Sequence, residues 1–232
     1  AIIDSLSVRV DAGELVAIVG PSGCGKTSFL RMIAGLESPT RGQLRLSDGP
    51  MDRPKIAYVF QDSTLLPWRT VVENIVLPLE LAGKSGRQSY QAAEEALRLV
   101  GLRDDDAAKF PRMLSGGMRM RVSLARAVVT HPQVMLFDEP FAALDDLLRS
   151  RLNEEILRLW KDQQWTGVFV THHVSEAIFL SKRVIVLTDR PARIAEVFDI
   201  PFEYPRSASL RTTPAFNQIV EKIVAQLRGG ER

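Results

Sequence analysis

Residues 20–27, near the start of this 232-residue chain, constrain its fold more than any other stretch. They read Gly-Pro-Ser-Gly-Cys-Gly-Lys-Thr, which fits the pattern of two glycines with four residues between them, followed by Lys and then Ser or Thr. An apolar run at 15–19 precedes the motif, and a stretch with helical character at 28–34 follows it. Because a phosphate-binding loop forms between a strand and a helix, this order predicts a nucleotide site.

Each part of this loop has a physical role in binding phosphate. Glycines let backbone N–H groups converge on an anion without a Cβ in the way, and the helix N-terminus adds a positive dipole end. We expect Lys26 to contact the terminal phosphates and the Thr27 hydroxyl to bind Mg²⁺. A glycine-rich turn with a surface lysine is the alternative, but the pattern arises by chance in only about 1% of chains of this length. The expected nucleotide-binding residues here are Gly20, Pro21, Ser22, Gly23, Cys24, Gly25, Lys26, Thr27 and Ser28.

The composition is that of an ordinary globular protein, with 45% hydrophobic and 25% charged residues, so the chain can bury a sizeable core. The formal net charge is +2, which gives no electrostatic reason to expect nucleic acid as a partner. A single cysteine rules out an internal disulfide and makes a reduced compartment the default. No stretch reaches the roughly 20 apolar residues of a membrane span, so we expect a soluble chain that can still dock onto a membrane partner.

Alternating strand and helix patterns predict an α/β protein with a parallel sheet. Leu6, Val8 and Val10 alternate as in a half-buried strand. Further strands are expected at 43–46, 56–60, 134–137, 168–171, 184–187 and 194–198, and a last helix at 214–227. We therefore expect an α/β core at 1–70 and 131–200, a helical subdomain at 71–130, and a C-terminal helical extension at 201–232.

Two adjacent carboxylates, Asp138 and Glu139, follow the buried strand expected at 134–137. Adjacent strand residues point in opposite directions, so we expect the two acids to differ in function. Asp138 can hold Mg²⁺ through water, while Glu139 can polarise the attacking water as a general base. A strand that ends in an acidic turn is the alternative, and the phosphate loop in the same chain makes it the weaker interpretation.

A second possible phosphate-binding helix start lies at 114–118, Leu-Ser-Gly-Gly-Met, before a stretch with helical spacing at 119–130. Ser115 is a good N-cap, and Gly116 and Gly117 leave backbone N–H groups open to an anion. A plain helix N-cap is the alternative, and these five residues alone do not exclude it.

Together with Gln61, the segment 143–145 and His172, these motifs occur in the order and spacing of the ATP-binding subunits of ABC transporters. The chain resembles that family over nearly its whole length. The resemblance implies a P-loop NTPase of the ABC ATPase type, with a mostly parallel sheet core, an N-terminal antiparallel β part and a helical insertion.

Details of the sequence resemble one part of this family. Residues 141–145 and the Leu-Leu-Pro-Trp at 65–68 are similar to bacterial importers. The signature that ends in Met118 rather than the commoner Gln, together with residues 189–194, is most similar to the nitrate, sulfonate and taurine branch.

The resemblance implies roles for several residues near the phosphates. Gln61 would sense Mg²⁺ and the attacking water, while the segment after it, including Trp68, leans toward a membrane subunit. His172 would contact the γ-phosphate and help hold the water-activating arrangement. The catalytic residues implied are Glu139, His172 and Gln61, and the Mg²⁺ ligands are Thr27, Gln61 and Asp138.

A dimer is also implied by the resemblance. Ser115, Gly116 and Gly117 would clamp the γ-phosphate of an ATP that loop 20–27 of a second copy holds, and Asp145 would lie across the dimer interface. Two ATP molecules would then be sandwiched between two chains arranged head to tail.

The start of the chain departs from the family pattern. Family members usually stack adenine on an aromatic residue roughly two dozen positions before the phosphate loop, yet Gly20 has only 19 residues before it here. The first aromatic residue is Phe29. We therefore expect the native N-terminus, including a first strand, to be missing, and assign no adenine-stacking residue.

These observations predict the ATP-hydrolysing subunit of an ABC importer for a small solute such as nitrate, a sulfonate or taurine, with ATP and Mg²⁺ as cofactors. Its expected partners are a second ATP-binding subunit in a homodimer or heterodimer, two transmembrane permease subunits, and a solute-binding protein through the complex. Its expected location is the cytoplasmic face of the bacterial inner membrane, as a peripheral protein. The alternatives are an exporter cassette, or a non-transport ABC ATPase that acts on ribosomes or DNA, although the chain has neither heptads nor a duplicated phosphate loop.

Overall fold

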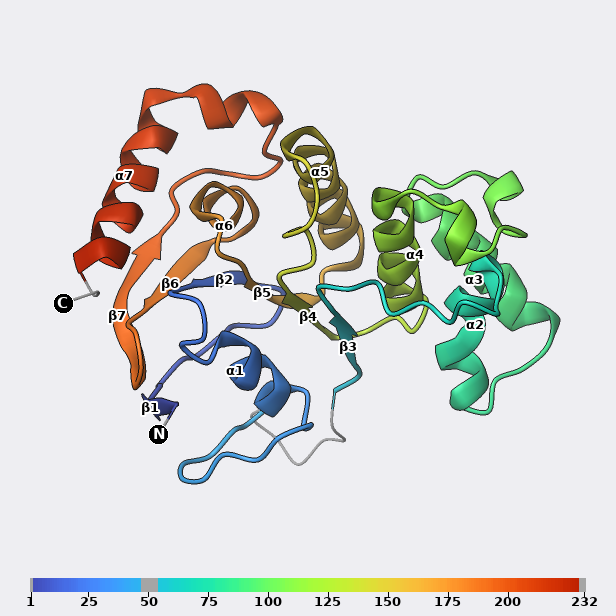
Figure 1. Ribbon diagram of the computed structural model, residues 1–232, viewed down its shortest axis with the longest axis horizontal. Helices are drawn as coiled ribbons and strands as arrows, with labels where there is room; N and C mark the ends of the chain where they lie inside the picture. The colour runs from blue at the N-terminus through green and yellow to red at the C-terminus, as the bar shows by residue number, and fades with distance from the viewer. Residues whose placement is uncertain (1, 47–53, 230–232) are drawn as a thin grey trace.

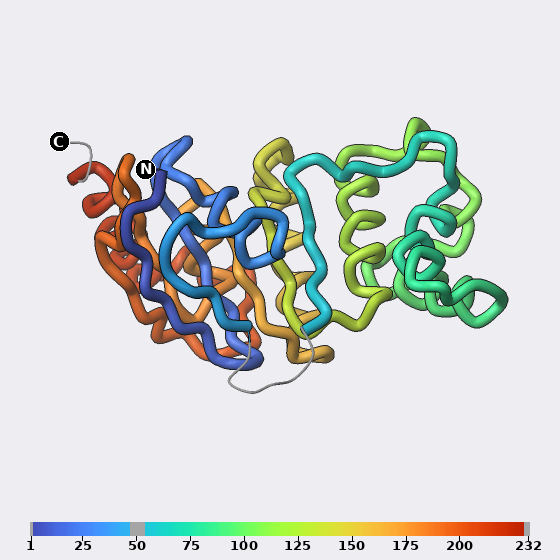
Figure 2. The backbone as a smooth tube through the Cα atoms, turned by 90° about the horizontal axis from the view of Figure 1, so that it is seen from below, coloured from blue at the N-terminus to red at the C-terminus, as the bar shows by residue number. Residues whose placement is uncertain are grey.

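The computed structural model describes residues 2–46 and 54–229, which form two lobes (Figure 1). The α/β lobe consists of a β-sheet with helices on both faces. In a view from below, two passes of the chain connect it to the second lobe, which is helical (Figure 2). The helical lobe contains α2 (Val71–Leu81), α3 (Arg87–Leu99), α4 (Gly116–Val128) and the short 3₁₀ helices η1 (Asp104–Asp106) and η2 (Pro111–Met113).

The described residues of the α/β lobe form a sheet with the strand order β1-β7-β6-β2-β5-β4-β3. The strands are β1 (Ile3–Ser5), β2 (Leu15–Val19), β3 (Ile56–Val59), β4 (Val134–Asp138), β5 (Thr166–Val170), β6 (Arg183–Leu187) and β7 (Ala192–Asp199). All neighbours are parallel except β6 and β7. The structure thus confirms the expected mostly parallel sheet.

Strand β2 is central because all five of its side chains are apolar and buried. Leu15, Ala17 and Val19 pack into one hydrophobic cluster, while Val16 and Ile18 pack into a second. This division follows from the alternation of side chains across a strand. One sheet face is covered by α1 (Lys26–Ile33), and the other by α5 (Asp146–Gln163), α6 (Val174–Leu180) and α7 (Pro214–Gly229) (Figure 1).

The antiparallel part of the sheet consists of β6 and β7, whereas the N-terminal strand β1 pairs in parallel with β7. The expected N-terminal position of this part is therefore wrong within the described residues. Leu6, Val8 and Val10 alternate in burial as predicted and pack against a core cluster, although they follow β1 without forming a strand. Residues 43–46 form no strand either, because most of their side chains are exposed and their alternating pattern buries no face.

Local sequence signals set the helix ends in the helical lobe. The Thr70 side chain accepts from the Glu73 backbone, and the Glu73 carboxylate accepts from the Thr70 N–H at 2.7 Å, which forms a capping box at the start of α2. Helix α3 ends before Gly101, whose φ of 71° suits glycine. After β6, the C-terminal segment, residues 192–229, forms β7, the 3₁₀ helix η3 (Ala208–Thr212) and α7, which confirms the predicted last helix.

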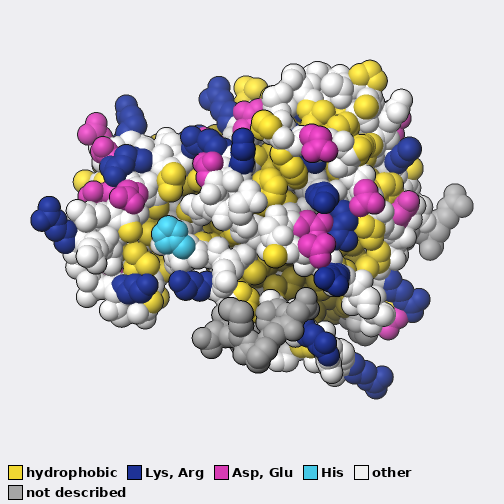
Figure 3. Space-filling view, turned by 180° about the vertical axis from the view of Figure 1, so that it is seen from behind, with side chains coloured by type: hydrophobic (Ala, Val, Ile, Leu, Met, Phe, Trp, Pro, Cys, Tyr) yellow, Lys and Arg dark blue, Asp and Glu magenta, His cyan; other side chains and the backbone are white. Residues whose placement is uncertain are grey.

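The surface carries charges of both signs. On the face shown in Figure 3, Lys and Arg side chains are interspersed with Asp and Glu, and apolar side chains lie between them. None of the helices in the described residues is long and apolar enough to span a bilayer.

Candidate nucleotide-binding site

The candidate site lies where β2, β4 and β5 end, at the carboxyl edge of the sheet, which is where open α/β sheets bind ligands. Loop 20–27 connects β2 to α1, as its sequence predicts. Gly23 and Gly25 have φ angles of 79° and 115°, a region that glycine adopts without strain. We call this loop, together with Asp138, Glu139 and His172, the cradle.

Lys26 is folded back over the loop that carries it. Its ammonium group is buried and donates to the carbonyl oxygens of Gly20 and Pro21, each at 2.8 Å. It also lies 4.0 Å from Glu139 Oε1. A lysine has three N–H donors, so one donor is left to reach a phosphate oxygen inside the cradle.

Thr27 and Asp138 meet across the cradle. The Thr27 hydroxyl donates to Asp138 Oδ1 at 2.9 Å, and the Tyr58 hydroxyl donates to the second oxygen, Oδ2, also at 2.9 Å. Burial and the neighbouring Asp138 carboxylate raise the pKa of Tyr58, so its hydroxyl stays a donor. Mg²⁺ that is bound to phosphates usually takes one or two oxygen ligands from the protein. A hydroxyl beside an oriented carboxylate can supply them.

Glu139, the first residue after β4, has a different side-chain partner from Asp138. A hydrogen bond of 2.8 Å joins His172 Nδ1 and Glu139 Oε2. The Glu139 backbone has a φ of 48°, which is uncommon for a residue with a side chain and more frequent at functional sites. The structure therefore brings Lys26, Glu139 and His172 together at one end of the sheet.

Cys24 and Gly23 are neighbours in the loop but differ in exposure, because Gly23 is exposed at its tip. Cys24 is fully buried, and burial raises the pKa of its thiol. The Arg190 guanidinium donates to the Gly23 carbonyl from the turn before β7, and so fixes the tip of the loop. Sequence reasoning did not identify Arg190, or Tyr58 on β3, as a site residue, because both contacts depend on tertiary folding.

The start of α4 forms a separate second feature, which we call the signature turn, residues 114–118. Ser115 is the N-cap of α4, and its hydroxyl accepts from the Met118 N–H at 3.3 Å. Ser115 and Gly116 are exposed, whereas a Cβ on Gly117 would lie 2.5 Å from the Leu148 side chain. Among the described residues, no hydrogen bond connects Ser115 to the cradle.

Asp145 is likewise an exposed N-cap, at the start of α5, where its side chain accepts from the Leu148 N–H at 3.0 Å. Arg149 donates to the carbonyl oxygens of Leu144, at 2.6 Å, and Phe141, at 3.3 Å. This arginine holds the loop between Glu139 and α5, a role that the sequence did not indicate.

Gln61 follows β3 and is exposed, and the described residues give its side chain no hydrogen-bond partner. The chain after it belongs to the helical lobe. Arg126 of α4 donates to the carbonyls of Ser63 and Thr64 at 2.8 and 2.9 Å. Asn74 of α2 is fully buried and also bonds to this segment, through the backbone of residues 66, 69 and 70.

The residues of the cradle fit a nucleoside triphosphate with Mg²⁺. The loop supplies N–H groups around glycines, a buried lysine donor and a helix N-terminus. Among the described residues, no cluster of three His, Cys, Asp or Glu side chains is placed to hold a metal alone. Thr27 and Asp138 could supply the one or two side chains through which proteins usually bind Mg²⁺ together with substrate phosphates.

A family model described as ABC transporter matches residues 3–142, more than half of the chain. The chain belongs to the ABC transporter family. Solved structures of ABC cassettes support the same conclusion. A dimeric post-hydrolysis ATP-binding cassette bound to ADP and Pi has a TM-score of 0.75 and 30% identity, and the match covers 87% of this chain and 92% of that one. The ABC ATPase fold and the ATPase class predicted from the sequence are thus confirmed.

Two relatives are similar to this ABC ATPase over nearly its whole length. An uncharacterized ABC transporter ATP-binding protein of Methanocaldococcus jannaschii is 42% identical, over 97% of this chain and 84% of the relative. The aliphatic sulfonates import ATP-binding protein SsuB of Bacillus cereus is 37% identical, over 99% of this chain and 90% of the relative. The expected importer-type resemblance is therefore confirmed at the level of sequence similarity.

Proposed function

We propose that this ABC ATPase powers an importer for a small oxyanion, with an aliphatic sulfonate as the first candidate solute. The observation that carries the proposal is the assembled cradle, with Thr27 on Asp138 and His172 on Glu139, in a chain similar to SsuB proteins over nearly its whole length. Nitrate and taurine are further candidates, because the sequence resembles the branch that includes their importers.

In this proposal Lys26 and the loop N–H groups bind the triphosphate, while Thr27 and Asp138 hold Mg²⁺. The metal, when bound, neutralises charge on the phosphates. Glu139 accepts a proton from the attacking water. Its carboxylate lies 4.0 Å from the Lys26 ammonium group, which contacts the terminal phosphates in this proposal. His172 holds that carboxylate by its 2.8 Å bond and contacts the γ-phosphate.

Within the part of the chain that the structure describes, the Gln61 side chain has no hydrogen-bond partner, so we propose that it joins Mg²⁺ and the attacking water only when the lobes close. Ser115, Gly116, Gly117 and Asp145 would act on a second copy. The exposure of Ser115, Gly116 and Asp145 in a single chain supports this role, because helix-start N–H groups that face outward can bind the phosphate of a facing cradle.

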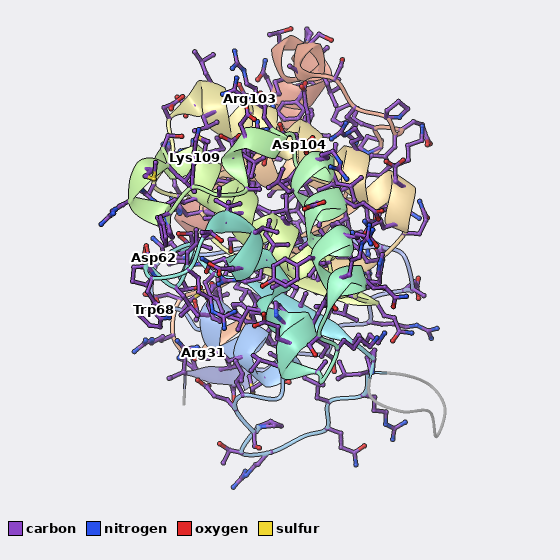
Figure 4. The ribbon with its side chains drawn as sticks, turned by 90° about the vertical axis from the view of Figure 1, so that its right-hand side faces the viewer. Arg31, Asp62, Trp68, Arg103, Asp104 and Lys109 are labelled. Atoms are coloured by element: carbon purple, nitrogen blue, oxygen red, sulfur yellow. The ribbon has the colours of Figure 1, made fainter. Side chains whose placement is uncertain are left out.

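Two membrane permease subunits are the proposed docking partners, with a solute-binding protein joined through them. Trp68 is 71% exposed, and Leu81, at the end of α2, is 80% exposed. Figure 4 shows Asp62, Trp68 and Lys109 along one edge of the molecule. The exposed aromatic side chain of Trp68 favours a protein interface at this edge. The chain would thus be peripheral, at the cytoplasmic face of the membrane.

The test is reconstitution with the permease and binding protein encoded beside its gene, in proteoliposomes supplied with ATP. We expect an alkanesulfonate with its binding protein to stimulate ATP hydrolysis and to accumulate inside the vesicles, and nitrate and taurine serve as competing solutes. ATP hydrolysis that responds to no solute, in a complex that assembles, would overturn the importer assignment and leave the ATPase class intact.

A further inference from the structure

Three buried polar side chains lie beneath the loop that carries His172. Thr171, Glu176 and Asn153 are 1%, 2% and 0% exposed. The proposed chemistry uses none of them. Burying polar groups costs free energy unless they are hydrogen-bonded, so their partners show what they hold in place.

Thr171 fixes the backbone on both sides of His172. Its hydroxyl donates to Glu176 Oε2 at 2.6 Å and accepts from the His173 backbone N–H at 3.0 Å. His172 itself lies between these two anchored residues, directly after β5 and before α6. A shift of the Glu176 carboxylate would therefore move the backbone from which the His172 ring reaches Glu139.

Glu176 is held in turn by the C-terminal segment. With its amide oriented to satisfy both neighbours, Asn153 of α5 donates to Glu176 Oε1 at 3.2 Å and accepts from Arg211 Nη2 at 2.9 Å. The Arg211 guanidinium also lies 4.2 Å from the centre of the Phe179 ring. Burial raises the pKa of Glu176, and the hydrogen bond from Thr171 opposes this shift.

The same segment holds the other end of α6. Arg206 is 6% exposed, and its Nη1 donates to the carbonyl oxygens of Ile178, Phe179 and Ser181 at 2.7, 3.1 and 2.9 Å. These carbonyls end a short helix and have few other partners. Helix α6 lies between α5 and α7 (Figure 1), so two arginines of the C-terminal segment hold the helix that follows His172.

We propose that Arg211 is a positioning residue for ATP hydrolysis, which acts on His172 through Asn153, Glu176 and Thr171. The inference rests on the role proposed above for His172. It predicts that the C-terminal segment, far from the phosphates in the chain, affects the chemical step rather than ATP binding. A purely structural role for Arg211 would instead lower stability without depending on His172.

The test is a double-mutant cycle on the full chain, with kcat and KM for Mg-ATP measured for each variant. We expect Arg211→Met to lower kcat about tenfold and to leave KM within about twofold. In a His172→Ala background, the same substitution should change kcat by less than about twofold, because the residue on which Arg211 acts is gone. Arg228→Met is the matched control, since Arg228 is an exposed arginine on α7 in the same segment.

A second pair of variants covers the case in which Arg211→Met does not fold. Thr171→Val removes the hydroxyl that links Glu176 to His173, and Thr171→Ser retains it. We expect Thr171→Val to lower kcat and Thr171→Ser to keep kcat near the wild-type value.

The other outcomes distinguish an error in the proposed role of His172 from an error in the inference about Arg211. If His172→Ala hydrolyses ATP at the wild-type rate, the proposed role of His172 is wrong and the inference falls with it. If His172→Ala is slow but Arg211→Met lowers kcat equally in both backgrounds, only the inference is overturned. An unchanged kcat in Arg211→Met, or in Thr171→Val where that pair replaces it, also overturns the inference.

Discussion

The cradle and the signature turn both present a glycine-rich helix start, yet they differ in how the chain holds them. In the cradle, Lys26 lies 4.0 Å from Glu139, Thr27 bonds to Asp138 and Glu139 bonds to His172, so each of these contacts joins residues that are distant in sequence. In the signature turn, the hydrogen bonds that Ser115 makes within the described residues all go to the first turn of its own helix. One helix start is thus held by contacts across the chain, and the other is left open.

This difference suggests a division of work between binding and hydrolysis. The cradle should bind ATP as a single copy, because its donors are already in place. Hydrolysis should need the signature turn of a facing chain. Substitutions on the two sides should therefore separate ATP affinity from turnover, and the following predictions test this comparison in order of decreasing effect.

The largest effect is expected at Glu139. Glu139→Gln retains the shape of the side chain but removes the base, so kcat should fall by about 100-fold to 10,000-fold while ATP still binds. Phosphate release measures the first effect and equilibrium binding of labelled ATP the second. Gel filtration with ATP should show an accumulated dimer. Turnover at the wild-type rate would contradict the role of Glu139.

A smaller but still large effect is expected at Ser115. Ser115→Asp keeps a good N-cap but turns a carboxylate toward the expected phosphate, so kcat should fall by about 100-fold. ATP affinity of the monomer should not change, because the cradle is intact. Ser115→Thr serves as the control that keeps the hydroxyl. If the Ser115→Asp monomer loses ATP affinity, the cradle does not bind ATP independently of the signature turn.

A third prediction concerns stability at the signature turn. Gly117→Ala places a Cβ 2.5 Å from the Leu148 side chain, whereas a Cβ on Gly116 would meet Leu144 at an ordinary 3.7 Å. We expect Gly117→Ala to lower the free energy of unfolding by about 1 kcal/mol or more. Gly116→Ala is the matched control and should be close to neutral. Urea unfolding measures both, and equal midpoints would show that Leu148 moves aside freely.

The smallest effect is expected at Tyr58, which orients Asp138 from within the cradle. Tyr58→Phe removes one hydrogen bond, worth about 1 kcal/mol, so half-saturation of the ATPase by Mg²⁺ should need about fivefold more metal. Tyr90→Phe is the control, because Tyr90 is an exposed tyrosine on α3. An unchanged Mg²⁺ requirement would mean that Thr27 alone orients this carboxylate.

The features that were predictable from sequence are those that local pattern determines. The loop at 20–27 and the acids at Asp138 and Glu139 stand at the ends of apolar runs whose length and composition indicate buried strands. Helix α7 has a regular apolar face that buries Phe216 and Ile223. In each case a few neighbouring residues contain the whole signal.

The features that sequence reasoning missed depend on contacts between distant residues. Tyr58 reaches Asp138 only because β3 pairs with β4, and Arg190 reaches Gly23 only because the turn before β7 lies over the loop. At residues 43–46 the local pattern was misleading instead. The sequence alternates as a strand does, but most of these side chains are exposed and the residues form no strand.

The attachment of residues 63–70 to the helical lobe, through Arg126 and Asn74, limits where the molecule can bend. Any rotation of one lobe against the other must be taken up by the few backbone torsions at 60–62 and by the equally short return after α4. His131, with a φ of 48°, lies in that return. The two hinges are therefore only a few residues each, and Gln61 occupies the middle of one of them.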